Sequence, residues 1–199
     1  MLLEEKGTIL YRSGLAGIFI GLGALLYTRC ENLYIGAFLF SFGLLCVLNF
    51  NALLFTGKIG YFDFHSTNMP EQIFRNVIML FYNIIGVLLV AAVSFDHSSM
   101  IFMTKLSHSM IHTFFSSVFC GIMMYLAVDL WKKTKTPLYV IMAVMIFILA
   151  GLDHCIANFY FFGINAYPAI QWRTLLFFFV NITGNAIGSM GIRALINLK

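Results

Sequence analysis

Long, continuous apolar runs follow one another along the chain, separated by short polar stretches. A helix that crosses a bilayer needs about 20 apolar residues, and six regions have the length and composition for a span. They are, in order, Leu10–Tyr27, Leu33–Phe64, Ile73–Phe95, Met110–Trp131, Leu138–Phe162 and Thr174–Leu195. Because the runs are continuous rather than alternating, they predict helices and not the strands of a β-barrel. We therefore predict an all-α integral membrane protein with six transmembrane helices.

The second and the fifth of these regions are interrupted. Asn49-Phe50-Asn51 and Thr56-Gly57-Lys58 break the second, and Gly151-Leu152-Asp153-His154 breaks the fifth. Each is followed by a span with the pattern Asn-x-x-Gly, at Asn83 and Asn185. Two halves of three spans lie in inverted orientation, and paired broken helices in such repeats point to a permeation site near the midplane. We predict one domain, residues 1–199, made of inverted repeats at about 8–95 and 109–195.

Composition and charge agree with this class. The chain of 199 residues is 61% hydrophobic and 10% charged, with a mean hydropathy of +0.91, which excludes a soluble domain. Glu4 and Glu5 stand where a signal peptide would be basic. The four cysteines form neither a CxxC motif nor a disulfide framework. We expect no cofactor, no metal, no enzymatic activity and no nucleic-acid partner.

The basic residues predict the orientation in the bilayer. With six spans both termini lie on one side, and that side holds nine of the twelve basic residues. They are Lys6, Arg12, Lys58, Arg75, Lys132, Lys133, Lys135, Arg193 and Lys199. Since cytoplasmic loops are enriched in lysine and arginine, we predict that both termini are cytoplasmic.

The candidate site is the polar stretch inside the fifth span. Ionisable side chains at membrane depth are expensive, so they face a cavity or a partner. On an unbroken helix, Phe147, Gly151, His154 and Asn158 would share one face. Such a cluster either lines a pathway or only joins helices, and the glycine and Asp153 favour a pathway.

The side chains around His154 have distinct expected roles. Asp153 precedes His154, so on a regular helix it points about 100° away. We therefore expect Asp153 to act on the helix break or on a neighbouring span. Asn158 and Thr56 are the candidates for orienting His154 or the substrate through hydrogen bonds. His108 and His112 have the spacing of two metal ligands on a helix, but no cysteine or carboxylate accompanies them.

Four motifs occur in order along the chain: Phe40-Ser41-Phe42-Gly43-Leu44, Leu54-Phe55-Thr56-Gly57, Gly151-Leu152-Asp153-His154-Cys155-Ile156-Ala157-Asn158 and Gly184-Asn185-Ala186-Ile187-Gly188. Together they resemble the formate/nitrite transporter family of formate, nitrite and hydrosulfide channels. The resemblance covers about residues 11–195. Two positions depart from the family pattern: Gly121 stands where many members have asparagine, and Leu53 replaces an acid.

The resemblance implies an aquaporin-like protomer with its own pore, assembled as a homopentamer in the inner membrane of a prokaryote. It implies hydrophobic constrictions, formed by Phe40, Leu44, Leu54, Phe55 and Phe147. It also implies a substrate pathway through Lys105, Thr56, His154 and Asn158, supported by Asp153 and Asn185.

The implied function is a channel for small monovalent weak-acid anions, with His154 assisting protonation of the substrate. A lone Lys105 outside the membrane would raise the local anion concentration. The alternatives are proton-coupled transport of acetate or lactate, a structural subunit without transport, and an intramembrane enzyme or haem protein that uses His154.

Overall fold

This computed structural model describes residues 2–94, 100–165 and 171–198, and for residues 2–6 the backbone alone. Throughout these residues the regular structure is helical. Four helices are long and apolar enough to cross a membrane: α1 (Leu2–Arg29), α4 (Met69–Val93), α6 (Met110–Thr134) and α9 (Trp172–Ile196). They correspond to the first, third, fourth and sixth predicted spans. The predicted end of the third span, Phe95, lies outside the described residues.

The second and fifth predicted spans are each divided, as the sequence indicated. The second consists of α2 (Leu33–Asn49), α3 (Phe55–Lys58) and the 3₁₀ helix η1 (Ile59–Tyr61). The fifth consists of α7 (Pro137–Leu149) and α8 (Cys155–Ile164). The prediction that Thr56-Gly57-Lys58 interrupts the second span is wrong. Those residues are helical in α3, and the irregular backbone covers residues 50–54 instead.

Both breaks are built in the same way. After α2, the backbone N–H of Ala52 donates to the carbonyl of Val47 at 2.8 Å; after α7, the N–H of Leu152 donates to Phe147 at 2.9 Å. This bond reaches back five residues and requires a left-handed residue just before the donor. Asn51 (φ 51°) and Gly151 (φ 68°) fill that position. Glycine and asparagine adopt this conformation at low cost, which is why the two helices end here.

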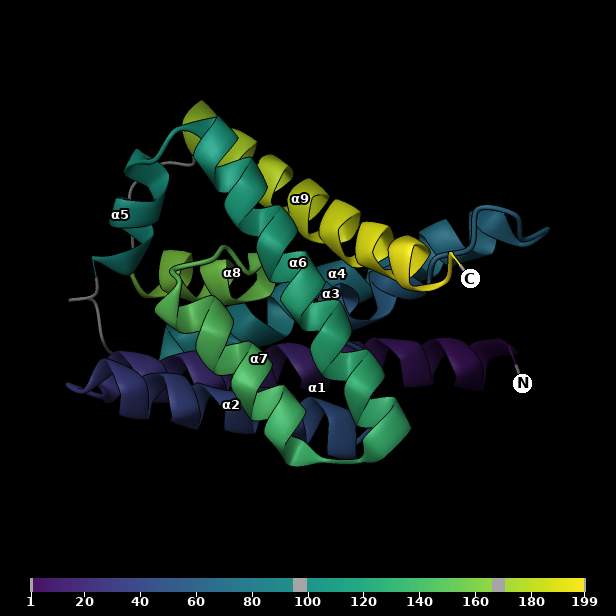
Figure 1. The fold of residues 1–199 in the computed structure, drawn as a ribbon, viewed down its shortest axis with the longest axis horizontal. Coiled ribbons are helices and arrows are strands. Elements are labelled where there is room, and N and C mark those ends of the chain that lie inside the picture. Colours follow the sequence, from purple (N-terminus) through teal and green to yellow (C-terminus); the bar gives the residue numbers. More distant parts are fainter. Residues whose placement is uncertain (1, 95–99, 166–170, 199) are drawn as a thin grey trace.

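The helices form two groups around the breaks. In Figure 1, α1 lies beside α2 and α4, and α6 lies beside α7 and α9. The groups meet where α2 packs against α7 and α4 against α8. The helix α5 (Ile101–Ser107), which the sequence did not predict, lies at the end of the molecule away from both termini. The broken segments therefore end in the interior, covered by the long helices.

Small residues allow the long helices to approach closely. A Cβ atom added to Gly17 in α1 would lie 2.2 Å from the carbonyl oxygen of Asn83 in α4. A Cβ atom added to Gly121 in α6 would lie 2.2 Å from the carbonyl oxygen of Asn185 in α9. Gly17 therefore allows α1 to contact α4 closely, and the same packing between α6 and α9 explains glycine at position 121.

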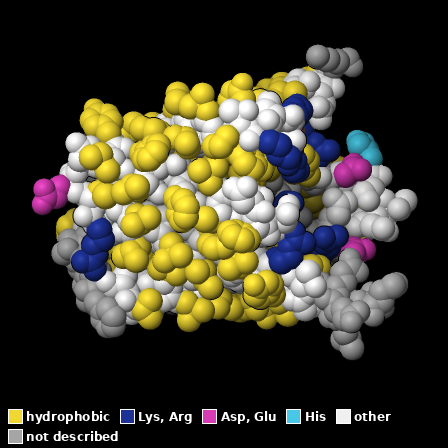
Figure 2. Space-filling view, turned by 90° about the horizontal axis from the view of Figure 1, so that it is seen from below, with side chains coloured by type: hydrophobic (Ala, Val, Ile, Leu, Met, Phe, Trp, Pro, Cys, Tyr) yellow, Lys and Arg dark blue, Asp and Glu magenta, His cyan; other side chains and the backbone are white. Residues whose placement is uncertain are grey.

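The surface divides into an apolar band and a basic end. Figure 2 shows hydrophobic side chains over the sides of the molecule, and most of the visible lysine and arginine side chains at the end that carries both termini in Figure 1. Lys199 and the side chain of Lys6 lie outside the described part. This distribution suits a multi-pass membrane protein.

Candidate functional site

Asn83 fastens the first break. Its side-chain oxygen accepts the N–H of Phe55 at 2.8 Å, and its amide donates to the carbonyls of Ser13 and Leu53 at 2.7 and 2.8 Å. Phe55 is the first residue of α3, so this side chain satisfies backbone groups that a helix end leaves open. Asn83 is fully buried. It therefore holds the start of α3 against α1 at membrane depth, where water is not available to do so.

Asn185 does the same at the second break. Its oxygen accepts the N–H of Cys155 at 2.8 Å, and its amide donates to the carbonyls of Ser117 and Asp153, both at 2.8 Å. Cys155 is the first residue of α8. The supporting role proposed for Asn185 now has a defined geometry. Asn83, which the sequence marked only as a repeat motif, has the same one.

His154 lies at the second break with both ring nitrogens in hydrogen bonds. Nδ1 accepts the backbone N–H of Ala157 at 3.1 Å, which makes His154 the N-cap of α8. Nε2 lies 3.0 Å from Oγ1 of Thr56 in α3. Because Nδ1 is an acceptor, a neutral ring carries its hydrogen on Nε2 and donates it to Thr56. The imidazole, 1% exposed, also stacks on the ring of Phe147 with centroids 5.6 Å apart.

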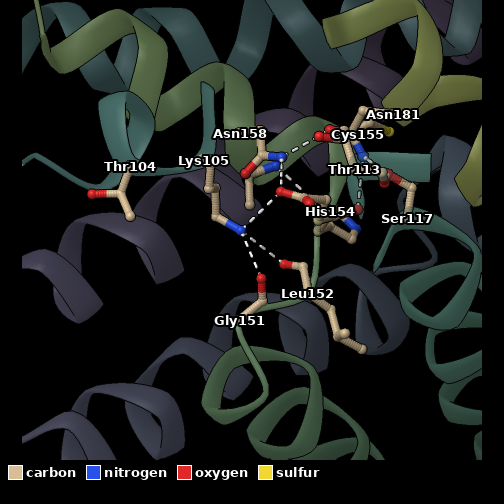
Figure 3. A network of polar contacts seen from close by, with 12 residues as sticks. Thr104, Lys105, Thr113, Ser117, Gly151, Leu152, His154, Cys155, Asn158 and Asn181 are labelled. Carbon is tan, nitrogen blue, oxygen red and sulfur yellow. Dashed lines mark hydrogen bonds and ion pairs between the residues drawn. The ribbon is translucent and has the colours of Figure 1, made fainter. Parts of the chain in front are cut away.

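Asp153 is paired with Lys105 of α5. The ammonium lies 2.9 Å from Oδ1 of Asp153 and also donates to the carbonyls of Gly151 and Leu152 at 3.0 and 3.1 Å (Figure 3). Lys105 is therefore not the isolated lysine that the sequence suggested. Its three N–H groups hold α5 to the backbone between α7 and α8. Asp153 bonds to Lys105 and Asn158 rather than to His154, in line with its expected role.

A chain of amides and hydroxyls extends this network into α9 and α6. Asn158 donates to Oδ1 of Asp153 at 3.1 Å and to Oδ1 of Asn181 at 2.8 Å. Asn181 donates to the carbonyl of Asp153 at 2.7 Å and to Oγ of Ser117 at 2.9 Å (Figure 3). Asn158 thus fixes Asp153 rather than the imidazole of His154. Asn181 and Ser117 were not predicted, although Asn181 precedes Asn185 by one helical turn.

A cavity with a volume of about 380 Å³ lies beside these residues, and we call it the His154 cavity. Its wall is mostly apolar with a few polar groups, as is typical of sites for small ligands. The lining residues used below are Phe40, Lys105, His108, Phe147, His154 and Asn158. Phe147, Gly151, His154 and Asn158 do share this wall, but not as one helix face, because the backbone between Leu149 and Cys155 is not helical.

A smaller cavity of about 70 Å³, the basic cavity, lies beside α3. Leu44 and Leu54 line it together with Lys58, Lys132 and Lys135. No residue lines both cavities. Phe40 and Leu44 lie one turn apart on α2 and face different cavities, so a thin layer of apolar side chains separates the two spaces.

The predicted constriction residues divide between these cavities. Phe40 and Phe147 meet edge to face at the His154 cavity, with ring centroids 5.7 Å apart. Leu44 and Leu54 belong to the basic cavity. Phe55, in contrast, is 5% exposed and lines neither cavity. Thr56 is fully buried and reaches the site only through His154.

In the described part of the chain, no group of three histidine, cysteine, aspartate or glutamate side chains is gathered. His108 and His112 do lie together, with ring centroids 4.3 Å apart. His108 caps α5 rather than sharing a helix with His112.

Two broken helices that meet at a buried polar centre, with a cavity beside each break, define the architecture of a membrane channel or transporter. The family model for formate/nitrite transporters matches residues 3–198, and the chain belongs to that family. It is accordingly a transport protein and not an enzyme. Among curated proteins, none matches the sequence.

Two solved structures have the same fold. One, described as an FNT family ion channel, is 18% identical, with a TM-score of 0.78 over 97% of this chain and 90% of the other. The second, described as a pentameric formate channel with formate bound, is 20% identical, with a TM-score of 0.80 over 98% of this chain and 99% of the other. At this identity the likeness concerns the fold.

Proposed function

We propose that the chain is a channel for small monovalent weak-acid anions of the formate, nitrite and hydrosulfide class. The observation that carries this proposal is the position of His154. It is buried in the wall of the His154 cavity, where its ring stacks on Phe147 and hydrogen-bonds to Thr56 of the other broken span. The substrate would enter the His154 cavity, cross the layer between Phe40 and Leu44, and leave through the basic cavity, or take the reverse route. Formate is the first candidate, since a solved structure of similar fold is described as holding it.

Passage through an apolar layer requires that the substrate lose its charge. Moving an anion out of water costs several kcal/mol even after relaxation, whereas the neutral acid avoids most of this cost. Desolvation itself favours the neutral form of an acid. His154 assists at the point where water is lost: its Nε2–H, which bonds to Thr56, turns to the substrate, while the start of α8 keeps the ring oriented through Nδ1. The same layer excludes ions that have no neutral form.

We further propose that the protomer consists of two inverted three-helix repeats, as in aquaporins. Supporting this, Asn83 and Asn185 make equivalent sets of three hydrogen bonds, and the two breaks have the same backbone bonds. Five such protomers would form a homopentamer in the inner membrane of a prokaryote, each with its own pore. The basic end seen in Figure 2 supports cytoplasmic termini.

A comparative flux assay tests the function. Purified protein in liposomes is given inward gradients of formate, nitrite, hydrosulfide, acetate or lactate, and uptake is followed with the accompanying proton flux. Fast, saturable uptake of the smallest acids, with slower acetate and lactate, is expected from the narrow apolar layer. Preference for acetate or lactate would replace the proposal with monocarboxylate–proton transport. No uptake of any of them would leave a structural role.

A further inference from the structure

His108 is a second imidazole in the wall of the His154 cavity, and the pathway described above does not use it. It directly follows α5 and is half-buried. Its ring lies 4.3 Å from that of His112, measured between centroids, with the planes tilted by 60°. His112 is in α6 and exposed. The two rings therefore span the distance from the cavity to the surface.

The backbone of His108 is fixed, whereas its ring keeps a free polar atom. The N–H of His108 donates to the carbonyl of Lys105 at 3.2 Å, and its carbonyl accepts Nη2 of Arg173 at 3.0 Å. Its Nδ1 is buried and has no hydrogen-bond partner among the described residues. A buried polar atom without a partner is costly unless a ligand or water satisfies it. Within the part of the molecule that the structure describes, this nitrogen takes no part in holding the protomer together, and the ring that carries it forms part of the cavity wall.

The other proton-bearing groups of the network are occupied. All three N–H groups of Lys105 donate to Gly151, Leu152 and Asp153. His154 can gain a proton on Nδ1 only by giving up the N–H of Ala157, the first bond of α8. Neither Lys105 nor His154 is therefore free to give a proton to an anion in this cavity, and His108 is the other imidazole in its wall.

We propose that His108, coupled to His112, protonates the weak-acid anion at the mouth of the His154 cavity. This proposal rests on the function proposed above. The imidazolium of His108 transfers one proton to an oxygen of the anion, or to the sulfur of hydrosulfide. The N–H bond breaks, the O–H or S–H bond forms, and neutral acid and neutral imidazole result. His108 then regains its proton from the solvent on the side of His112.

The charges around His108 tie this proton to the anion. Lys105 in α5, Arg173 in α9 and a protonated His112 in α6 present positive charge to it. The carboxylate of Asp153, in the link between α7 and α8, is bound to Lys105. These positive groups attract an entering anion, which brings a negative charge next to His108. Proton uptake and anion entry therefore favour each other.

The experiment measures formate uptake into liposomes as a function of external pH, between about pH 5 and 8, where histidine exchanges protons. If the neutral acid had to come from solution, uptake would fall about tenfold for each pH unit. Uptake by the wild-type protein is expected to fall less steeply with rising pH. His108→Gln should match wild type at the acidic end and show the full slope above it. His65→Gln, an exposed histidine at the other end of the molecule, is the matched control and should behave as wild type.

A His108→Gln profile that stays parallel to wild type at every pH, whether equal or lower by a constant factor, overturns the proposal. His112→Gln gives an independent test, because this side chain is exposed and its loss leaves the fold intact. Removing the ring in contact with His108 should change the pH profile of uptake, and an unchanged profile would contradict the coupling. Uptake by the wild-type protein tests the proposed function separately, so the two failures are distinct.

Discussion

His154 is held as a neutral, oriented donor by its two hydrogen bonds. One bond comes from the first turn of α8 and the other goes to a side chain of the opposite half of the chain. The ring therefore cannot turn without loosening one of the two breaks. This explains why an imidazole is placed at the junction itself rather than on a regular helix.

Replacing His154 with phenylalanine keeps the ring and its stacking on Phe147 but removes both hydrogen bonds. We expect the pH-dependent transport of formate to be lost while the protein remains folded and assembled. Flux in liposomes and size-exclusion chromatography measure the two properties. His65→Phe, at an exposed position, serves as control. A well-folded His154→Phe protein with normal pH-dependent flux would refute the assigned role.

Lys105 and Asp153 form a largely buried ion pair, with side chains 12% and 1% exposed. Removing one partner leaves the other charge without compensation, which typically costs about 3–5 kcal/mol. We expect Lys105→Gln or Asp153→Asn alone to lower the melting temperature and the flux. The double variant should lose less melting temperature and less flux than the sum of the losses of the two single variants.

A thermal melt in detergent provides this double-mutant cycle. Strictly additive effects would mean that the pair does not act as a unit. The flux of Lys105→Gln across a salt series adds a second readout. A deficit that persists at high salt indicates loss of the pair, whereas one that vanishes indicates an electrostatic attraction of anions from solution.

At the scale of the elements, α2 and α7 each carry a bulky apolar residue shortly before the break in their span. Phe147 belongs to α7, and Leu44 to α2. Truncating either residue to alanine opens the apolar layer at one cavity, and we expect faster passage of acetate relative to formate. Phe119→Ala, at a side chain 55% exposed on α6, is the control. If both variants keep the wild-type ratio of acetate to formate uptake, the constrictions lie elsewhere.

The packing of α6 on α9 depends on a glycine, which has no side chain at the contact. A Cβ at Gly121 would lie 2.2 Å from the carbonyl oxygen of Asn185, the residue that fastens the second break. Forcing extra volume into such a contact costs about 1–3 kcal/mol. Gly121→Ala should therefore melt at a lower temperature and show reduced flux. At Gly191, in the same helix pair, a Cβ meets nothing within 4 Å, so Gly191→Ala should melt as wild type does.

At the scale of the whole molecule, a single protomer exposes many large aromatic side chains. Phe42 of α2 is 59% exposed and Phe179 of α9 is 68% exposed. Some of this surface faces lipid, and we expect the rest to be covered by other copies of the chain. Native mass spectrometry in mild detergent should show five copies. A stable monomer or dimer that transports formate would rule out the need for a pentamer.

The sequence by itself determined the membrane class, the divided second and fifth spans and the position of the buried histidine. Each of these follows from local properties: the length of apolar runs, the preference of glycine and asparagine for left-handed backbone, and the cost of ionisable groups at membrane depth. The approximate positions of the four long helices follow for the same reason, although α1 begins at Leu2 and not at the predicted Leu10. The helical state of Thr56-Gly57-Lys58 could not be predicted in this way, because Asn83, 28 residues away from Phe55, stabilises the start of α3.

Only the tertiary structure decided which side chains contact one another at the site. Two of these contacts join residues far apart in the sequence: Lys105 and Asp153 are separated by 48 positions, and Thr56 and His154 by 98. The separation of Phe55 from both cavities depends on how the helices pack. Hydrogen bonds and ion pairs at such separations depend on the direction of each side chain once the helices have packed. Periodicity along the chain assigns a residue to a helix face, but the left-handed turn at Gly151 redirects the chain, so the contacts beyond it are set in three dimensions.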